Sequence, residues 1–142
     1  MTAKCFVDTN VLIYAFDTGE PAKQALAQGL LDRLTDDDEL VLSTQVLKEF
    51  FSVVTRRIKQ PLTADAAEQT VRHFARFPII GTDVSLLLLA IARHRKDSVS
   101  IWDALIVEAA RRAKAKTLYT EDLQDGRDFD GLAVENPFRE QP

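Results

Sequence analysis

Apolar residues occur along this chain in short continuous runs that alternate with longer stretches of helical periodicity. The short runs are bounded by polar or turn-forming residues, which is the pattern of buried strands. Such runs predict strands at 4–8, 39–43, 77–81, 117–120 and 132–135. The longer stretches begin at a capping residue or at a proline, and they predict helices at 21–35, 45–59, 64–76, 84–95 and 101–115.

The order of these elements predicts an α/β fold. Helices connect most of the successive strands, and such connections produce a mostly parallel sheet flanked by helices. We therefore expect a central sheet of about five strands. With 142 residues, the chain is expected to form a single domain over residues 1–142, with the last few residues loose.

Composition narrows the setting in which the protein works. The single cysteine, Cys5, excludes a disulfide within the chain and fits a reducing compartment. The longest apolar run, 84–92, is too short to cross a bilayer, which takes about 20 residues. We therefore expect a cytoplasmic protein without a membrane segment. The net charge of −4 provides no overall basic surface for nucleic acid, although basic residues cluster at 56–59, 93–96 and 111–116.

Asp8 is unusual because it stands inside an apolar run, FVDTNVLIYA at 6–15. A buried carboxylate is costly unless it is hydrogen-bonded, paired with a cation or bound to a metal. Three further acids, Glu49, Asp103 and Asp122, follow other predicted strands or begin a predicted helix. Sites in open α/β sheets form outside the carboxyl ends of the strands. We therefore expect these four acids to gather at one edge of the sheet.

Each acid also has an ordinary structural role open to it. Asp8 can cap a helix or an Asx-turn, and Asp103 can complete a capping box with Ser100. Glu49 can border the apolar face of its helix, and Asp122 can belong to a solvated acidic turn. These roles are local, whereas the four acids come from segments spread over more than a hundred residues of sequence, as expected for a site assembled by the fold.

Four carboxylates at one edge would repel one another, and a hard divalent cation relieves that repulsion. A set of oxygen ligands suits Mg²⁺ or Mn²⁺. The two histidines, His73 and His94, are isolated and are expected on helix surfaces. The sequence therefore favours a magnesium or manganese site over a zinc site.

At this point the sequence resembles the PIN-domain family, in particular the VapC-type toxins of toxin–antitoxin systems. The segments that carry the resemblance, which covers nearly the whole chain, are 6–15, 42–57, 100–110, 118–126 and 136–138. The resemblance implies a parallel sheet flanked by helices and a metal-dependent endoribonuclease activity on RNA. It also implies a homodimer and a small antitoxin that covers the acidic site, with the helices at 21–35 and 45–59 as candidate contact surfaces.

Carried over residue by residue, the resemblance makes the four acids the catalytic, metal-binding quartet. Asp8 and Asp103 would be direct ligands, and Glu49 and Asp122 would bind a second ion or outer water molecules. Thr9, Asn10 and Thr120 match the polar residues that support such a site, whereas Glu121 and Asp125 are alternates for the fourth acid.

Two other functions compete with the nuclease. A phosphoryl-transfer domain would use Asp8 as a nucleophile, but it would need a lysine after a late strand, and no lysine follows Lys116. A binding module with the same fold and no catalysis would be expected to lack part of the acidic set. Trp102 and Tyr119 can stack on a base, but their apolar context predicts core packing for both.

Overall fold

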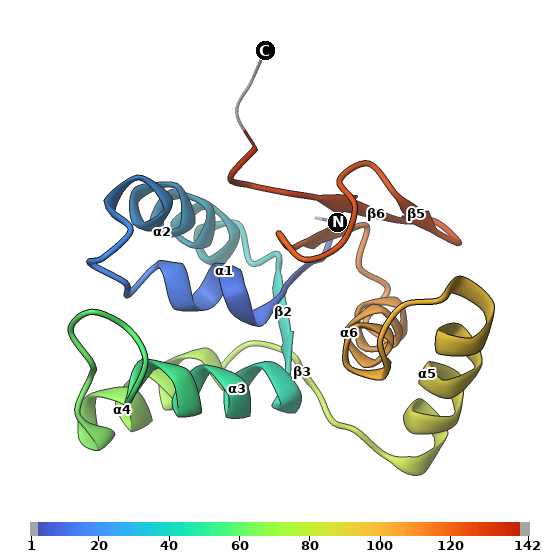
Figure 1. The fold of residues 1–142 in the computed structure, drawn as a ribbon, viewed down its shortest axis with the longest axis horizontal. Coiled ribbons are helices and arrows are strands. Elements are labelled where there is room, and N and C mark those ends of the chain that lie inside the picture. The colour runs from blue at the N-terminus through green and yellow to red at the C-terminus, as the bar shows by residue number, and fades with distance from the viewer. Residues whose placement is uncertain (1–2, 140–142) are drawn as a thin grey trace.

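The computed structural model describes residues 3–139 and shows a sheet with helices on both sides (Figure 1). The strands are β1 (Cys5–Val7), β2 (Leu40–Ser43), β3 (Ile79–Ile80), β4 (Thr117–Tyr119), β5 (Asp128–Phe129) and β6 (Leu132–Glu135). The helices are α1 (Thr9–Tyr14), α2 (Pro21–Asp36), α3 (Thr44–Val54), α4 (Ala64–Phe74), α5 (Val84–Asp97) and α6 (Ile101–Arg112).

The sheet has the strand order β3-β2-β1-β4-β6-β5. All neighbouring strands are parallel except β5 and β6, which are antiparallel. Helices α1 to α4 lie on one side of the sheet, and α5 and α6 lie on the other (Figure 1). The predicted α/β class is therefore confirmed, with six strands in place of about five.

The strand that the sequence interpretation missed forms a hairpin with β6. Asp130 and Gly131 connect the two strands, and both have positive φ, 55° and 101°. An Asp-Gly pair with this geometry is a favoured two-residue hairpin turn. Because the Asp-Gly pair can be read directly from the sequence, β5 was predictable from this turn.

The second difference is α1, a short helix that starts one residue after Asp8. The prediction extended the first strand to residue 8, whereas β1 ends at Val7. The backbone amide of Asp8 still donates to the Tyr119 carbonyl of β4 at 2.9 Å, and the chain then turns into the helix. Asp8 consequently stands at the junction between a central strand and a helix.

The core lies on both faces of the sheet, and Phe6, Phe50 and Leu118 are fully buried within it. Tyr119 is buried, as predicted, but the prediction for Trp102 was wrong because its side chain is 66% exposed. Trp102 lies in the first turn of α6, two residues before the buried stretch of that helix begins at Ala104. No helix in the described range 3–139 has both the length and the apolar character that crossing a membrane requires. The predicted loose end includes residues 140–142, which lie outside that range, and the single domain over 1–142 stays a prediction.

Candidate functional site

The carboxylate of Asp8 accepts hydrogen bonds from three neutral groups, one of which is Nδ2 of Asn10 at 3.5 Å from Oδ2. Its side chain caps α1, with Oδ1 accepting from the Thr9 amide at 2.7 Å. Oδ2 accepts from the Thr120 hydroxyl at 2.8 Å. The side chain is 5% exposed, so the carboxylate is buried without a cationic partner among the contacts of the described residues. The predicted capping role and the predicted site position therefore coincide.

Thr120 connects this carboxylate to the loop after β4. Its hydroxyl oxygen accepts from Nδ2 of Asn10 at 3.3 Å and from the backbone amide of Asp122 at 3.1 Å, while the hydroxyl donates to Asp8. The residue is fully buried. Thr120 thus sets the direction in which the loop leaves the sheet and brings Asp122 back toward Asp8.

Asp103 reaches the same place from the other side of the sheet. Ser100 caps α6 by accepting a hydrogen bond from the Asp103 amide at 3.0 Å, which confirms the predicted cap. One carboxylate oxygen from each of Asp8, Asp103 and Asp122 lies within 4.8 Å of the other two. The fold therefore brings together three acids that are separated by 95 and 19 residues in sequence.

Burial and the charges of neighbouring acids raise the pKa values of Asp8 and Asp103. Desolvation by burial is the largest cause that raises the pKa of Asp8, to about 7 from its ordinary 3.8. The hydrogen bonds from Thr120 and Thr9 oppose that change, whereas the charges of Asp122 and Asp103 add to it. Burial likewise raises the pKa of Asp103, with smaller contributions from the charges of Asp122 and Glu49. Asp8 and Asp103 therefore hold a proton more tightly than free carboxyl groups do.

Glu49 lies beside this group without entering it. Its side chain is exposed, and Oε2 accepts from the Thr9 hydroxyl at 3.1 Å. Oε1 accepts from Nε2 of Gln45 at 2.9 Å, one helical turn earlier on α3. The sequence interpretation missed Gln45, although the spacing of four residues on a helix was a usable signal.

The two alternates for the fourth acid are engaged elsewhere. Glu121 accepts from the Tyr14 hydroxyl at 2.7 Å and from Nζ of Lys23 at 2.9 Å. Asp125 accepts from the Asn136 amide at 2.7 Å and pairs with Arg139. Among these three neighbouring acids, Asp122 is the one whose carboxylate lies with Asp8 and Asp103.

Comparison with known proteins identifies the family. Residues 5–130 match the PIN domain. The chain belongs to the PIN-domain family. No curated protein matches it significantly.

Solved structures of VapC- and FitB-type toxins share the fold of this PIN domain. One is a toxin–antitoxin complex from Klebsiella pneumoniae, with 19% identity, a TM-score of 0.71, and coverage of 94% of this chain and 98% of that one. Mycobacterium tuberculosis VapC20, described as a sarcin-ricin loop cleaving toxin, has 21% identity, a TM-score of 0.63 and coverage of 84% and 92%. FitAB bound to the IR36 DNA fragment has 18% identity, a TM-score of 0.68 and coverage of 97% and 98%. At these identities the likeness establishes the fold alone.

The acidic group of the PIN domain fits a divalent metal ion. It presents oxygen atoms from three carboxylates, which is the ligand type that Mg²⁺ and Mn²⁺ prefer. The raised pKa of Asp8 reflects first its burial and then the negative charges of Asp122 and Asp103. A cation bound by these oxygens would favour the ionised carboxylates and relieve the repulsion between them.

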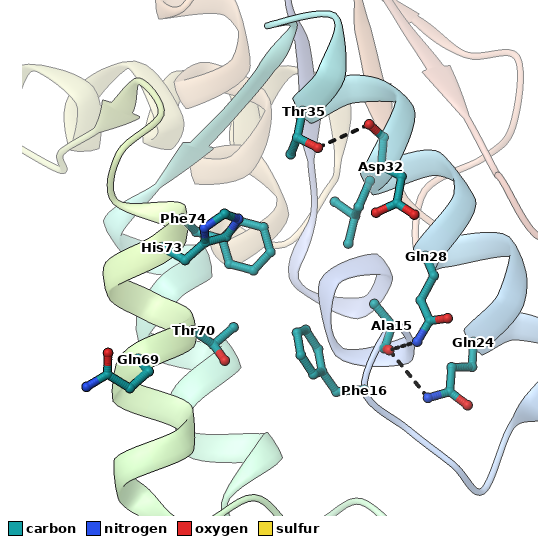
Figure 2. A pocket seen from close by; sticks show the side chains of 11 residues that line it. Ala15, Phe16, Gln24, Gln28, Asp32, Thr35, Gln69, Thr70, His73 and Phe74 are labelled. Carbon is teal, nitrogen blue, oxygen red and sulfur yellow. Dashed lines mark hydrogen bonds between the residues drawn. The ribbon is translucent and has the colours of Figure 1, made fainter.

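One cavity of this PIN domain lies away from the group of Asp8, Asp103 and Asp122. It has a volume of about 620 Å³ and is bordered by α2 and α4, with Phe16 between them (Figure 2). Gln24 and Gln28 of α2 donate to the Ala15 carbonyl at 3.4 and 2.8 Å, which closes the end of α1. None of the acids in the group of three lines this cavity, so its size is no argument for catalysis there.

Proposed function

We propose that this PIN-domain protein is an endoribonuclease that depends on Mg²⁺ or Mn²⁺ and is the toxin of a type II, VapBC-like toxin–antitoxin pair. The observation that carries the proposal is the group of Asp8, Asp103 and Asp122. Asp8 is buried with a raised pKa, and within residues 3–139 it has no cationic partner among its contacts. Such an arrangement is costly for folding and is expected where a metal ion is bound.

The proposed roles follow from the positions of the side chains. Asp8 and Asp103 would be direct ligands, and Asp122 and Glu49 would bind a second ion or orient water molecules around the first. The cation would neutralise charge on the phosphoryl oxygens and lower the pKa of an attacking water. Thr120 keeps one oxygen of Asp8 in place through its 2.8 Å hydrogen bond, so the carboxylate is oriented before any substrate arrives.

Two features of Asp8 argue against a covalent phosphoryl-transfer mechanism. A nucleophilic carboxylate needs an oxygen that can reach the phosphorus atom of its substrate. Asp8 is 5% exposed, and each of its oxygens accepts a hydrogen bond. The catalytically silent binding module is the remaining alternative, and it is an outcome of the experiment below.

The proposed partners are RNA, a small cognate antitoxin and a second copy of this chain. Two of the similar structures are a toxin–antitoxin complex and FitAB on DNA, which supports an antitoxin as partner. A homodimer is supported by large apolar side chains exposed on α5, among them Val84, Leu88 and Leu89. A reducing cytoplasm fits the single, buried Cys5.

The test is incubation of antitoxin-free protein with total cellular RNA in Mg²⁺, in Mn²⁺ and in EDTA. Asp8→Asn removes the charge and keeps the shape. Asp36→Asn is the matched control because this exposed residue ends α2 just before β2 begins. It therefore lies near the amino end of a strand, whereas Asp8 follows the carboxyl end of β1. Discrete cuts that require metal, persist in the control and vanish in Asp8→Asn would support the proposal. Intact RNA in every lane, from folded protein, would favour the silent module.

A further inference from the structure

A cavity of about 330 Å³ is lined by α1 and α3 and includes two of the acids, Glu49 and Asp122. The residues that line it come from these two helices and from the loop after β4: Thr9, Asn10, Ile13, Glu49, Ser52, Val53, Arg57 and Asp122. On α3 they recur every three or four residues, which places them on one face of the helix. The cavity therefore continues along that face, away from the centre of the acidic group.

The two ends of this cavity carry opposite charges. Glu49 and Asp122 mark the acidic end, and Arg57 lies eight residues after Glu49. α3 ends at Val54, and Arg57 follows in the turn after it, where its amide donates to the Val53 carbonyl at 2.7 Å. Arg57 is the basic residue among those that line the cavity in the described part of the chain.

The guanidinium of Arg57 is available to a ligand. Among the contacts of residues 3–139, its side chain takes part in neither a hydrogen bond nor an ion pair. The neighbouring Arg56 differs, because its Nε donates to the Ser52 carbonyl at 3.2 Å and its terminal nitrogen donates to the Ser52 hydroxyl at 2.7 Å. Arg56 is thus folded back on α3 and does not line the cavity.

We propose that Arg57 binds a backbone phosphate of single-stranded RNA next to the phosphodiester that is cut. This inference rests on the proposed nuclease function and adds a substrate-positioning residue to it. The planar guanidinium offers paired donors that match phosphate oxygens. A polyanion that follows the cavity meets Arg57 at one end and the cation-requiring acids at the other. Ile13 and Val53 give the stretch between them an apolar surface.

The contact gives RNA a direction and a register on the protein. A chain held at one phosphate by Arg57 presents a defined neighbouring bond to the acidic group. Because the phosphate contact is the same for all four nucleotides, it positions the strand without reading its sequence. Removal of Arg57 should therefore weaken binding of all single strands similarly.

The experiment measures binding of a fluorescein-labelled single-stranded RNA of mixed sequence by anisotropy. All proteins carry Asp8→Asn so that the RNA stays intact, and the added changes are Arg57→Ala, Arg57→Lys and, as the matched control, Arg56→Ala. We expect Arg57→Ala to weaken binding about tenfold and to lower the salt slope by about 0.7, the value for one phosphate contact on a single strand. Arg57→Lys should keep the salt slope, and Arg56→Ala should match the parent.

Equal binding by the Arg57→Ala and Arg56→Ala proteins would overturn the proposal. Misfolding is checked by thermal unfolding, and it is not expected because the Arg57 side chain makes no bond within residues 3–139. In the catalytic background, loss of a binding contact should raise KM and leave kcat nearly unchanged. Failure of the nuclease proposal would be seen separately, as absence of cutting by the unaltered protein.

Discussion

Asp8→Asn should stabilise the metal-free protein, and increasingly so as the pH rises. The substitution removes the charge of a carboxylate that is 5% exposed and whose pKa is raised to about 7 from 3.8. A raised folded-state pKa means that the folded protein binds the proton more tightly than the unfolded chain does. The contribution of Asp8 to stability is therefore full below pH 3.8 and is lost as the pH rises through about 7.

The expected size follows from the change in pKa. At about 1.36 kcal/mol per pKa unit, a change of about three units costs about 4 kcal/mol once Asp8 is fully ionised. By linkage, the cost is about 1.5 kcal/mol at roughly pH 5 and about 4 kcal/mol at roughly pH 8.5. The asparagine amide also meets the Thr120 hydroxyl less well, which costs about 1 kcal/mol at every pH. The stability difference between variant and parent should therefore grow by about 2.5 kcal/mol across that range.

The assay is urea unfolding of both proteins in EDTA at several pH values between those limits. Comparing the difference at two pH values cancels the constant effect of the changed hydrogen bond. A difference that stays the same at all pH values would refute the reasoning, because it would mean that Asp8 titrates normally in the folded state. Saturating Mn²⁺ should make the parent the more stable of the two proteins at high pH. The ion stabilises the folded parent by binding to it, and it binds the variant more weakly because one of its ligands is gone.

Three further substitutions test other parts of the structure. Arg93→Ala removes a buried guanidinium that contacts three carboxylates, including Glu108 at 3.0 Å; urea unfolding should show a loss of about 3 kcal/mol, and a loss below about 1 kcal/mol would contradict the buried network. Ser100→Ala removes the cap of α6 and should cost about 1 kcal/mol, whereas Ser100→Gly should cost much less in the same assay. Thr120→Val removes a hydrogen bond that lowers the pKa of Asp8. The pKa of Asp8 should therefore rise, and Mn²⁺ binding measured by calorimetry near neutral pH should weaken. Unchanged binding would mean that Thr120 does not affect the pKa of Asp8.

Local patterns in the sequence were sufficient for most of the elements. The runs that predicted five strands all contain strands of the sheet, and α2 begins at Pro21 as expected. α3 is shorter than predicted and ends at Val54, because the chain turns back and the Leu62 amide donates to the Val54 carbonyl at 2.8 Å. The reversal is formed by a contact beyond the helix, so periodicity within the helix could not show it.

The acidic group was predictable in outline for a topological reason. Parallel strands end at one edge of a sheet, so acids placed after different strands converge there. Glu49 lies next to the group of three, as an exposed neighbour. The assignment of all four acids, and of Thr9, Asn10 and Thr120, to metal binding and catalysis stays a prediction.

The sequence by itself determined most of the strands and helices, with β5 and α1 as the exceptions, and which acids follow them, because apolar periodicity and capping residues act over a few neighbours. Tertiary structure alone decided which of the three acids after β4 turns inward. Thr120 accepts from the Asp122 amide, and Tyr14 and Lys23 hold Glu121 outside the group. Tertiary structure also decided the pKa of Asp8, because desolvation depends on everything packed around a carboxylate, and the groups that shift it include Thr120, Asp122 and Asp103, which are distant in sequence.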